Sequence, residues 1–285
     1  MPNSAVPAGK PAQDPPRRSR PLLTLEVLRR EQLTPHMVRI VAGGPNFEHF
    51  AGNGFADAYC KIWFGPDGKP LDGSAELEAL REQFPRDQWP VSRTYTIRSV
   101  NAAARELAID FVVHGDEGLA GPWAAGAAAG ERLSFTGPGG AFDPDPDAGW
   151  YLFAADESAL PATAAVLEAL PSAAVGQVFV EVGGPRDRQP LSAPEGVTVT
   201  WLYRGELPAG NTGLLAAAVA AAPWPSNDVQ VFAHGEREAM KALRDVLFGA
   251  RGLERRQVSL SGYWAAGRTE DAFQAEKRTP VGKIL

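Results

Sequence analysis

The sequence has too few cysteines and histidines for the common metal centres and for disulfide cross-links. Its single cysteine, Cys60, excludes an internal disulfide, a four-cysteine zinc site and a cysteine-ligated iron–sulfur cluster. The four histidines, His36, His49, His114 and His234, show no spacing typical of metal ligands. Cys60 lies in an apolar run, where a buried strand residue is more common than a nucleophile. We therefore expect no metal site.

An excess of positive charge and long apolar runs are also missing. The net charge of −6 argues against nucleic acid or an anionic membrane as the main partner. No apolar run approaches the roughly 18 residues that a membrane span needs, so we expect no membrane insertion. Residues 1–20 are rich in Pro, Ala and Arg without the apolar core of a secretory signal, and we expect a flexible leader there. We expect a cytoplasmic monomer.

Length and patterning predict two domains. A chain of 285 residues with 44% hydrophobic and 22% charged residues suits two globular domains of roughly 100–150 residues each. Across residues 21–141, runs that alternate apolar and polar residues predict antiparallel strands with little helix, which is typical of a β-barrel. We expect strands at 22–30, 37–42, 57–64, 93–99, 106–114 and 132–136, and short helices at 75–83 and 123–128.

The pattern changes after a Pro- and Asp-rich linker at residues 142–149. Strands and helices alternate over residues 150–285, which predicts an α/β domain with a parallel sheet whose ligand lies at the carboxyl ends of the strands. We expect strands at 150–154, 177–182, 197–202, 229–233 and 257–262, and helices ending at Leu170 and spanning 211–221, 236–251 and 270–278.

One barrel strand carries residues that suit a flavin. The guanidinium of Arg93 offers a planar, bidentate partner for a diphosphate. Tyr95 supplies a ring face, and the hydroxyl of Thr96 can bond a ring heteroatom. A second run, 110–118, ends a strand in a polar, glycine-containing turn that can bring backbone N–H groups to a phosphate. The same residues are also ordinary strand composition, so the later motifs decide the interpretation.

In their order along residues 22–270, the motifs resemble those of siderophore-interacting proteins, the FAD-containing ferric-siderophore reductases related to ferredoxin reductases. The motifs are Arg93–Arg98, Asp110–Gly115, Trp123-Ala124, Gly137-Pro138, Asp156–Pro161, Gly235-Glu236 and Ser261–Trp264. Each is weak alone, whereas the full set in this order is specific. The resemblance implies a ferredoxin-reductase-like fold, with an antiparallel β-barrel FAD-binding domain followed by an α/β parallel-sheet NAD(P)-binding domain.

The resemblance also implies a set of cofactor-binding residues. They are Arg93, Tyr95, Thr96, Ile97, Val113, His114, Gly118, Ala120, Trp123, Asp156, Glu157, Ser158, Gly235, Glu236, Tyr263 and Trp264. Residues 93–96 of the strand hold the FAD pyrophosphate, ribityl chain and ring. His114, Gly118 and the start of the helix at Trp123 surround the pyrophosphate and adenine. The turn at 156–158 opens a helix whose N-terminus faces NADPH or NADH. Gly235 and Glu236 line the nicotinamide, and Tyr263-Trp264 lies near the flavin and the opening of the substrate site.

Several positions depart from the family pattern. The pyrophosphate turn usually reads Gly-Pro-Ala-Ser/Thr but is Gly118–Gly121 here, so a hydroxyl donor is missing. The family's Gly-Asp-Glu-Thr begins with Ala155, which narrows the space for a phosphate. His234 replaces an alanine before Gly-Glu; it is either a structural histidine or a ligand contact of the second domain, and we favour the structural role. Ala265 replaces the arginine of a Tyr-Trp-Arg signature that would help to bind an anionic chelate.

The implied reaction is the FAD-dependent reduction of a ferric siderophore, with NADPH or NADH as the electron donor. It needs no acid–base dyad, nucleophile or metal ligand, because the flavin carries the chemistry. Basic side chains near the flavin would hold the anionic chelate. Lys61 is our first candidate, Arg268 is expected to substitute for the missing arginine, and Lys277 and Arg278 are weaker candidates.

Some alternatives stay open at this level. Arg186 and Arg188 suit the 2′-phosphate of NADPH, whereas Asp187 or Glu181 would prefer the ribose hydroxyls of NADH, and we favour NADPH. A small ferredoxin is another conceivable donor, and the type of siderophore is undefined. Two other functions compete with the reductase: another flavin or quinone reductase, and a non-catalytic siderophore binder with a decayed cofactor site.

Overall fold

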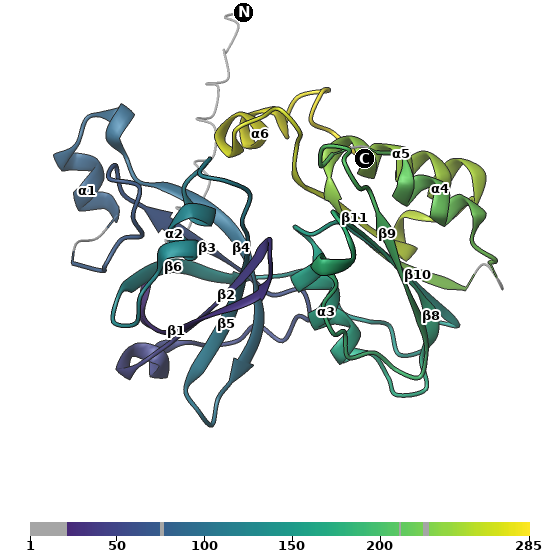
Figure 1. Cartoon of the computed structure of the whole chain (residues 1–285), viewed down its shortest axis with the longest axis horizontal. Helices are drawn as coiled ribbons and strands as arrows, with labels where there is room; N and C mark the ends of the chain where they lie inside the picture. The colour runs from purple at the N-terminus through teal and green to yellow at the C-terminus, as the bar shows by residue number, and fades with distance from the viewer. Residues whose placement is uncertain (1–21, 75–76, 211, 225–227) are drawn as a thin grey trace, which may run out of the picture.

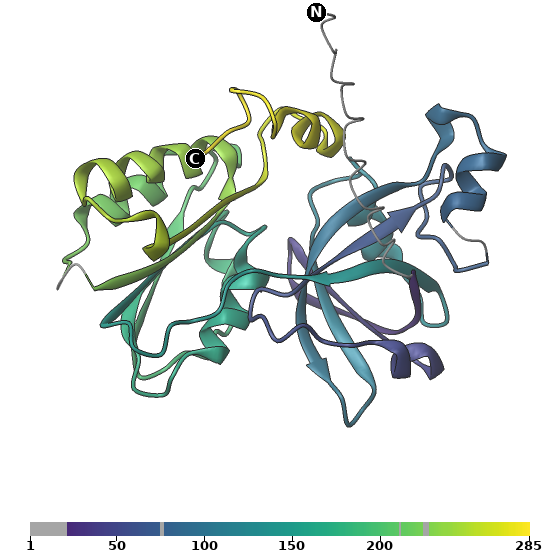
Figure 2. The same cartoon turned by 180° about the vertical axis from the view of Figure 1, so that it is seen from behind.

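The computed structural model describes residues 22–74, 77–210, 212–224 and 228–285, so the leader expected at 1–20 lies outside it. A closed β-barrel is followed by a parallel sheet covered by helices, and the two parts stand side by side (Figure 1). This arrangement confirms the predicted fold class. The C-terminal helix α6 (Glu270–Glu276) extends from the second part toward the barrel, as the reverse view also shows (Figure 2).

The barrel closes in the strand order β1-β2-β5-β4-β3-β6, and all of its pairs are antiparallel. The strands are β1 Leu23–Thr34, β2 Met37–Gly43, β3 Tyr59–Phe64, β4 Val91–Asn101, β5 Glu106–Val112 and β6 Arg132–Gly139. Strand β3 shows why the alternating pattern forms a barrel wall. Cys60, Ile62 and Phe64 are fully buried, whereas Tyr59 and Lys61 are exposed and Trp63 is half-buried. The outward face of β3 therefore presents one lysine between two aromatic side chains.

Short helical turns connect the barrel strands: η1 Pro45–His49, α1 Leu77–Gln83, η2 Arg86–Gln88 and α2 Ala120–Gly126. Helix α1 is the one expected at 75–83; its first two expected residues lie outside the described ranges. Helix α2 begins three residues earlier than the expected start at Trp123, because it starts directly after the turn at Gly118. Both helices thus sit in the predicted connections.

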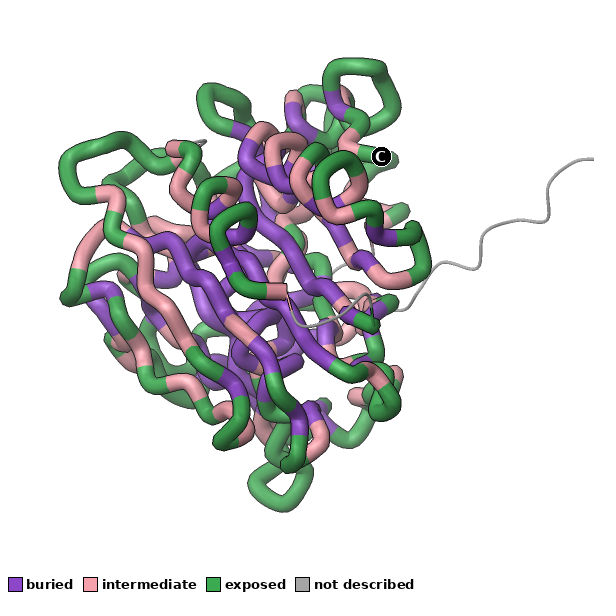
Figure 3. The backbone as a smooth tube through the Cα atoms, turned by 90° about the vertical axis from the view of Figure 1, so that its right-hand side faces the viewer, coloured by how far each residue is buried: buried purple, intermediate pink, exposed green. Residues whose placement is uncertain are grey.

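The second part is a five-stranded parallel sheet in the order β11-β10-β7-β8-β9. Its strands are β7 Trp150–Ala155, β8 Val175–Val182, β9 Gly196–Tyr203, β10 Val229–Glu236 and β11 Val258–Trp264. Every residue of β7 is buried, as expected for a central parallel strand covered on both faces. Figure 3 shows the buried strands as a purple interior beneath exposed loops.

Helices cover both faces of this sheet. Helix α3 (Leu160–Ala169) packs with Tyr151 and Phe153 on one face. Helices α4 (Leu214–Ala221) and α5 (Arg237–Arg244) pack with Leu152 on the other. The turns are η3 Pro185–Asp187, η4 Asp245–Ala250 and η5 Arg255–Gln257. The helix expected over 236–251 is α-helical only to Arg244 and then continues as a π-helical turn, η4.

Among the described residues, two ion pairs and one histidine–carboxylate contact join the barrel to the second part. Arg98 of β4 pairs with Glu168 of α3 at 2.5 Å, and α3 packs against β4. His36, in the turn between β1 and β2, lies 2.7 Å from Asp187 of η3. The second ion pair, 3.2 Å long, joins Arg93 of β4 to α6. No helix among the described residues is long and apolar enough to cross a membrane.

Candidate active site

Arg93 on β4 is held in a geometry that suits a two-oxygen anion. Two guanidinium nitrogens of Arg93 each donate to one carboxylate oxygen of Asp271 at 3.2 Å, and one also donates to the carbonyl of Ser92 at 3.0 Å. The Arg93 side chain is 16% exposed and that of Asp271 is 64% exposed. A carboxylate on the outer side of α6 therefore occupies the bidentate face of a largely enclosed arginine.

Tyr95 lies two residues further along β4, with its ring against the barrel interior. The rings of Tyr95 and Phe111 are 4.4 Å apart, and Phe111 in turn meets Trp123 edge-on at 5.6 Å. Burial raises the pKa of the Tyr95 phenol, and the carboxylate of Glu270 adds to this shift. The neighbouring predicted residues, Thr96 and Ile97, are buried as well, so Tyr95 lies in a tightly packed part of β4.

The turn between β5 and α2 leaves its backbone accessible. Its start is tied to the neighbouring hairpin, because Val113 N–H donates to the carbonyl of His36 at 2.9 Å. His114 and Gly118 are exposed, and Gly118 has φ +83°, which favours glycine. The helix that follows begins at Ala120. An exposed glycine turn before a helix can present N–H groups to a phosphate.

Asp156 ties together three segments of the second part. One carboxylate oxygen accepts from Ser158 N at 2.9 Å, Ser158 Oγ at 2.5 Å and Ala159 N at 3.3 Å. The other accepts from Glu236 N and Trp264 Nε1, both at 2.8 Å. Four residues predicted from distant motifs therefore meet where β7, β10 and β11 end. Asp156 is only 7% exposed, so it organises this junction from within.

The other acidic residues of these motifs, Glu157 and Glu236, also have hydrogen-bond partners within the protein. Glu157 accepts from Arg204 at 2.6 Å and from Gly183 N at 2.9 Å; burial raises its pKa, and Arg204 opposes that shift. Glu236 caps α5 by accepting from the N–H groups of Glu238 and Ala239, the second and third residues of the helix. Gly235, at φ +156°, has no room for a Cβ, which would lie 2.9 Å from Asp156. These residues shape the junction, and direct contact with a nucleotide stays a prediction for them.

His234 belongs to the same junction but faces inward. Its Nδ1 lies 2.9 Å from the hydroxyl of Tyr263, and its Nε2 lies 2.9 Å from Ser259 Oγ. The imidazole stacks on Phe232 with ring centres 3.9 Å apart. Burial lowers the pKa of His234 to about 3, so the ring is neutral, and burial also raises the pKa of Tyr263. These contacts match the structural interpretation of His234.

We expect His234 to make the folded chain sensitive to acid. Its pKa in the folded chain is about 3, against 6.5 for an ordinary histidine. Between these values the unfolded chain binds the extra proton, so the free energy of unfolding falls as the pH falls, by up to about 1.4 kcal/mol per pH unit. His234→Gln, which keeps hydrogen-bonding groups, is expected to flatten this slope in urea titrations from pH 7 to 4. An unchanged slope would contradict the assignment.

The candidate substrate residues differ in their surroundings. Lys61 projects from the outer face of β3, and Lys277 follows α6 with its ammonium 4.6 Å from the ring of Phe273. Burial lowers the pKa of Lys277, the carboxylate of Glu270 opposes this shift, and the positive charge of Lys61 adds to it. Neither lysine forms an ion pair within the part of the chain that the structure describes.

Arg268 is held differently. Its Nε donates to Glu276 at 2.7 Å, and the same carboxylate also receives the guanidinium of Arg237, which is 5% exposed. The charge of Arg268 is therefore partly balanced by Glu276, which also pairs with Arg237. Sequence reasoning missed Arg237 and Asp271 as parts of this region, because neither lies in a motif and both act through contacts with distant segments.

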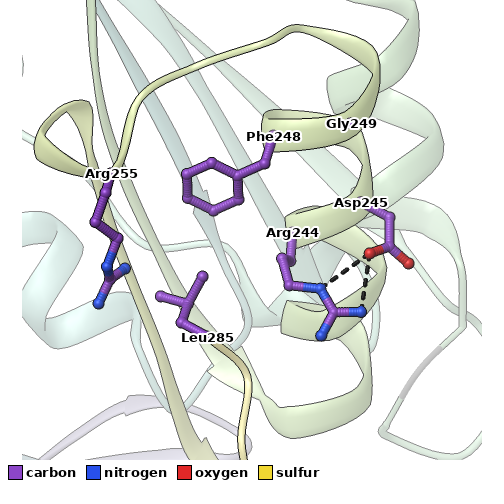
Figure 4. A pocket seen from close by; sticks show the side chains of 6 residues that line it. All are labelled: Arg244, Asp245, Phe248, Gly249, Arg255 and Leu285. Atoms are coloured by element: carbon purple, nitrogen blue, oxygen red, sulfur yellow. Dashed lines mark hydrogen bonds and ion pairs between the residues drawn. The ribbon is translucent and has the colours of Figure 1, made fainter.

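Two surface hollows lie outside this junction. A groove of about 460 Å³ between the barrel and α3 is lined in part by Ile97, Arg98 and Glu168. Another, of about 500 Å³, is lined by Arg244, Phe248 and Leu285 among others (Figure 4). The second hollow sits at the C-terminal end of α5, the opposite end of the helix from Glu236. Of the predicted site residues, only Ile97 lines either hollow.

Comparison with protein-family models assigns both parts of the chain. Residues 26–142 match the siderophore-interacting FAD-binding domain, and residues 148–267 match the siderophore-interacting protein model. The chain belongs to the siderophore-interacting protein family. The barrel and the parallel sheet, in this order, make up the ferredoxin-reductase-like fold that the motifs predicted.

Three relatives place this member within the family. The ferric vibriobactin reductase ViuB of Vibrio cholerae is 33% identical, over 89% of this chain and 93% of its own. The NADPH-dependent ferric-chelate reductase of Escherichia coli is 31% identical, over 85% and 92%. The crystal structure of a siderophore utilization protein from T. fusca is 38% identical and superposes with a TM-score of 0.76, over 87% of this chain and 94% of that one.

Proposed function

We propose that this siderophore-interacting protein is an FAD-dependent reductase that uses NAD(P)H to reduce ferric siderophores. One hydride supplies two electrons, which reduce two ferric ions, one electron each. Iron stays on its chelator during the reaction, and the hard oxygen ligands then hold Fe(II) less tightly. Bound FAD would supply the redox chemistry by taking up the hydride's electrons and passing them on singly. The observation that carries the proposal is the bidentate contact of Arg93, which lies beside Tyr95 on β4, with a carboxylate of α6.

The barrel residues fit FAD chemically. Arg93 already binds a two-oxygen carboxylate in bidentate fashion, which is the arrangement that a pyrophosphate needs. Tyr95 contributes a neutral aromatic ring next to it. The exposed turn at Gly118 contributes backbone N–H groups, although its hydroxyl-bearing family residue is Gly121 here. Arginine would hold the phosphates and tyrosine would hold the ring.

The second part supplies the nucleotide site in this proposal. The order in which strands are added to its sheet reverses at β7, since β8 and β9 lie on one side of that strand and β10 and β11 on the other. Ligands of open α/β sheets bind at the carboxyl ends of the strands at such a point. Asp156 fixes the three strand ends there, and Gly235 allows the backbone to approach closely. The residues of this junction orient the nucleotide and exclude water, and none of them transfers a proton.

Lys61 and Lys277 are the residues that we assign to the chelate. The positive charge of Lys61 adds to the burial that lowers the pKa of Lys277, so an anion bound beside Lys277 would be favoured, and ferric siderophores are often anionic. Arg268 is a weaker candidate because Glu276 already balances its charge. The absence of an arginine at Ala265, which is 2% exposed, is thus offset by the lysine pair.

A ferrous-capture assay tests this function. We expect the FAD-loaded protein to produce Fe(II), trapped by a ferrous-specific chelator, from a ferric siderophore and NAD(P)H. Lys61→Gln is expected to raise KM for an anionic chelate about fivefold, equivalent to about 1 kcal/mol for an exposed charge pair. Lys69→Gln, at an exposed lysine of the next loop, is the matched control. Quinones or free flavin reduced faster than any ferric chelate would favour the general reductase, and failure to take up FAD would favour the binder.

A further inference from the structure

We propose that the chain selects NADPH over NADH through Arg186 and Arg188, and that the barrel enforces this choice by holding Asp187 away from the nucleotide. The inference rests on the proposed function, which leaves the choice of nucleotide open. It assigns the 2′-phosphate to two arginines and a positioning role to His36, which lies on the barrel and outside every motif.

The position of the loop makes it the discriminating segment. Strand β8 is the second strand of the βαβ unit that begins with β7, and it ends at Val182. In nucleotide-binding domains of this kind, the residue that distinguishes NAD from NADP follows the second strand. Here the loop after β8 runs Gly183-Gly184-Pro185 and then through Arg186, Asp187 and Arg188. One carboxylate and two guanidinium groups thus lie in the loop that is expected to meet the 2′ position of the nucleotide.

The acids that would favour NADH are not presented to a ribose. Asp187 is 6% exposed: one oxygen accepts from Gly184 N at 3.0 Å and the other lies 2.7 Å from His36 Nδ1. Glu181 is 2% exposed and accepts from Thr212 Oγ1 at 2.8 Å. Both carboxylates are thus buried and already hydrogen-bonded, so presenting either one to ribose hydroxyls would require it to turn out of its present position.

The arginines on either side of Asp187 are exposed. Neither Arg186 nor Arg188 forms an ion pair among the residues that the structure describes. The guanidinium of Arg188 lies 5.8 Å from the ring centre of Trp201 on β9, which fixes its direction. Arg204, the next arginine nearby, is bound to Glu157 and is not available. Two uncompensated guanidinium groups at this position suit a phosphate dianion.

His36 links this choice to the contact between the two parts. It lies in the turn between β1 and β2, whereas Asp187 lies in η3 of the second part. If His36 is lost, the Asp187 oxygen that faces it is freed, while the bond from Gly184 remains. A freed carboxylate beside the arginines repels a 2′-phosphate and accepts from ribose hydroxyls. His36→Ala is therefore expected to shift preference toward NADH without touching either arginine.

The test uses the FAD-loaded protein and measures binding of NADP⁺, NAD⁺ and adenosine 2′,5′-bisphosphate by calorimetry. We expect NADP⁺ to bind at least about tenfold more tightly than NAD⁺. Arg186→Ala and Arg188→Ala are each expected to weaken NADP⁺ and the bisphosphate about tenfold and to leave NAD⁺ within about twofold. Arg188→Ala should also change the fluorescence response of Trp201. Arg255→Ala, at an exposed arginine beside the hollow of Figure 4, is the matched control.

Three results would overturn the inference: equal binding of the two nucleotides, equal weakening of both in the arginine variants, or an unchanged nucleotide preference in His36→Ala. These outcomes are separate from failure of the proposed function. Selective NADP⁺ binding without ferric reduction would contradict the proposed reductase function and support the inference about nucleotide choice. Ferric reduction driven by a reduced ferredoxin, with no binding of either nucleotide, would support ferric-siderophore reduction and contradict the inference about nucleotide choice.

Discussion

Arg93→Ala is expected to weaken FAD binding roughly 10- to 150-fold. Arg93 is placed to make two hydrogen bonds to the FAD pyrophosphate, but it must first give up its two bonds to Asp271, so we expect a net loss equal to one hydrogen bond to a charged partner, about 1.5–3 kcal/mol. The dissociation constant is measured by titrating apoprotein into FAD and following the quenching of flavin fluorescence.

Arg98→Ala is the matched control, because Arg98 lies on the same strand but pairs with Glu168 of α3. We expect it to leave FAD affinity nearly unchanged while loosening the contact between β4 and α3. Equal losses in the two variants would mean that Arg93 acts only by stabilising β4.

Asp271→Asn is expected to change FAD affinity in the opposite direction from Arg93→Ala. In the structure its carboxylate occupies the bidentate face of Arg93, so FAD must displace it. Asparagine removes the charge, and FAD is then expected to bind about threefold more tightly, in keeping with the small contribution of an exposed ion pair. Weaker FAD binding in Asp271→Asn would show that α6 must hold Arg93 in place for the cofactor.

Asp156→Ala is expected to lower the free energy of unfolding by about 3–5 kcal/mol. The carboxylate accepts hydrogen bonds from four residues, and its loss leaves the buried donors of Glu236 and Trp264 without a partner. Urea unfolding followed by tryptophan fluorescence gives the free energy. The junction that orients the nucleotide should be lost with it.

Ser158→Ala is the control for that experiment. It removes one hydroxyl donor to Asp156 and leaves the remaining bonds in place, so a loss of about 1 kcal/mol is expected. If Asp156→Ala costs no more than Ser158→Ala, the carboxylate does not hold the three strand ends together.

The sequence predicted the barrel and the sheet because burial in each strand follows simple periodicity. Alternation in β3 and continuous burial in β7 are visible in the residues themselves. It did not predict that β10 would run through Glu236 directly into α5. That join depends on Glu236 serving as the helix cap, and local patterning does not distinguish a capping carboxylate from one that faces a ligand.

The candidate site was harder to predict because its contacts span the chain. Asp156 meets Trp264 across 108 residues, and Arg93 meets Asp271 across 178. Motifs identified Asp156 and Arg93 but could not show what already occupies their hydrogen-bonding groups. For the same reason the sequence ranked Arg268 above Lys277, because it could not show that Glu276 forms an ion pair with Arg268.

Anaerobic stopped-flow absorbance of the FAD-loaded protein tests the central claim most directly. The protein is mixed first with NADPH or NADH and then with a ferric siderophore. We expect NADPH to bleach the oxidised-flavin band faster than NADH, and the ferric siderophore to restore it with two ferric ions consumed per flavin. A flavin that NADPH reduces but that no ferric siderophore reoxidises would contradict the assignment as a ferric-siderophore reductase.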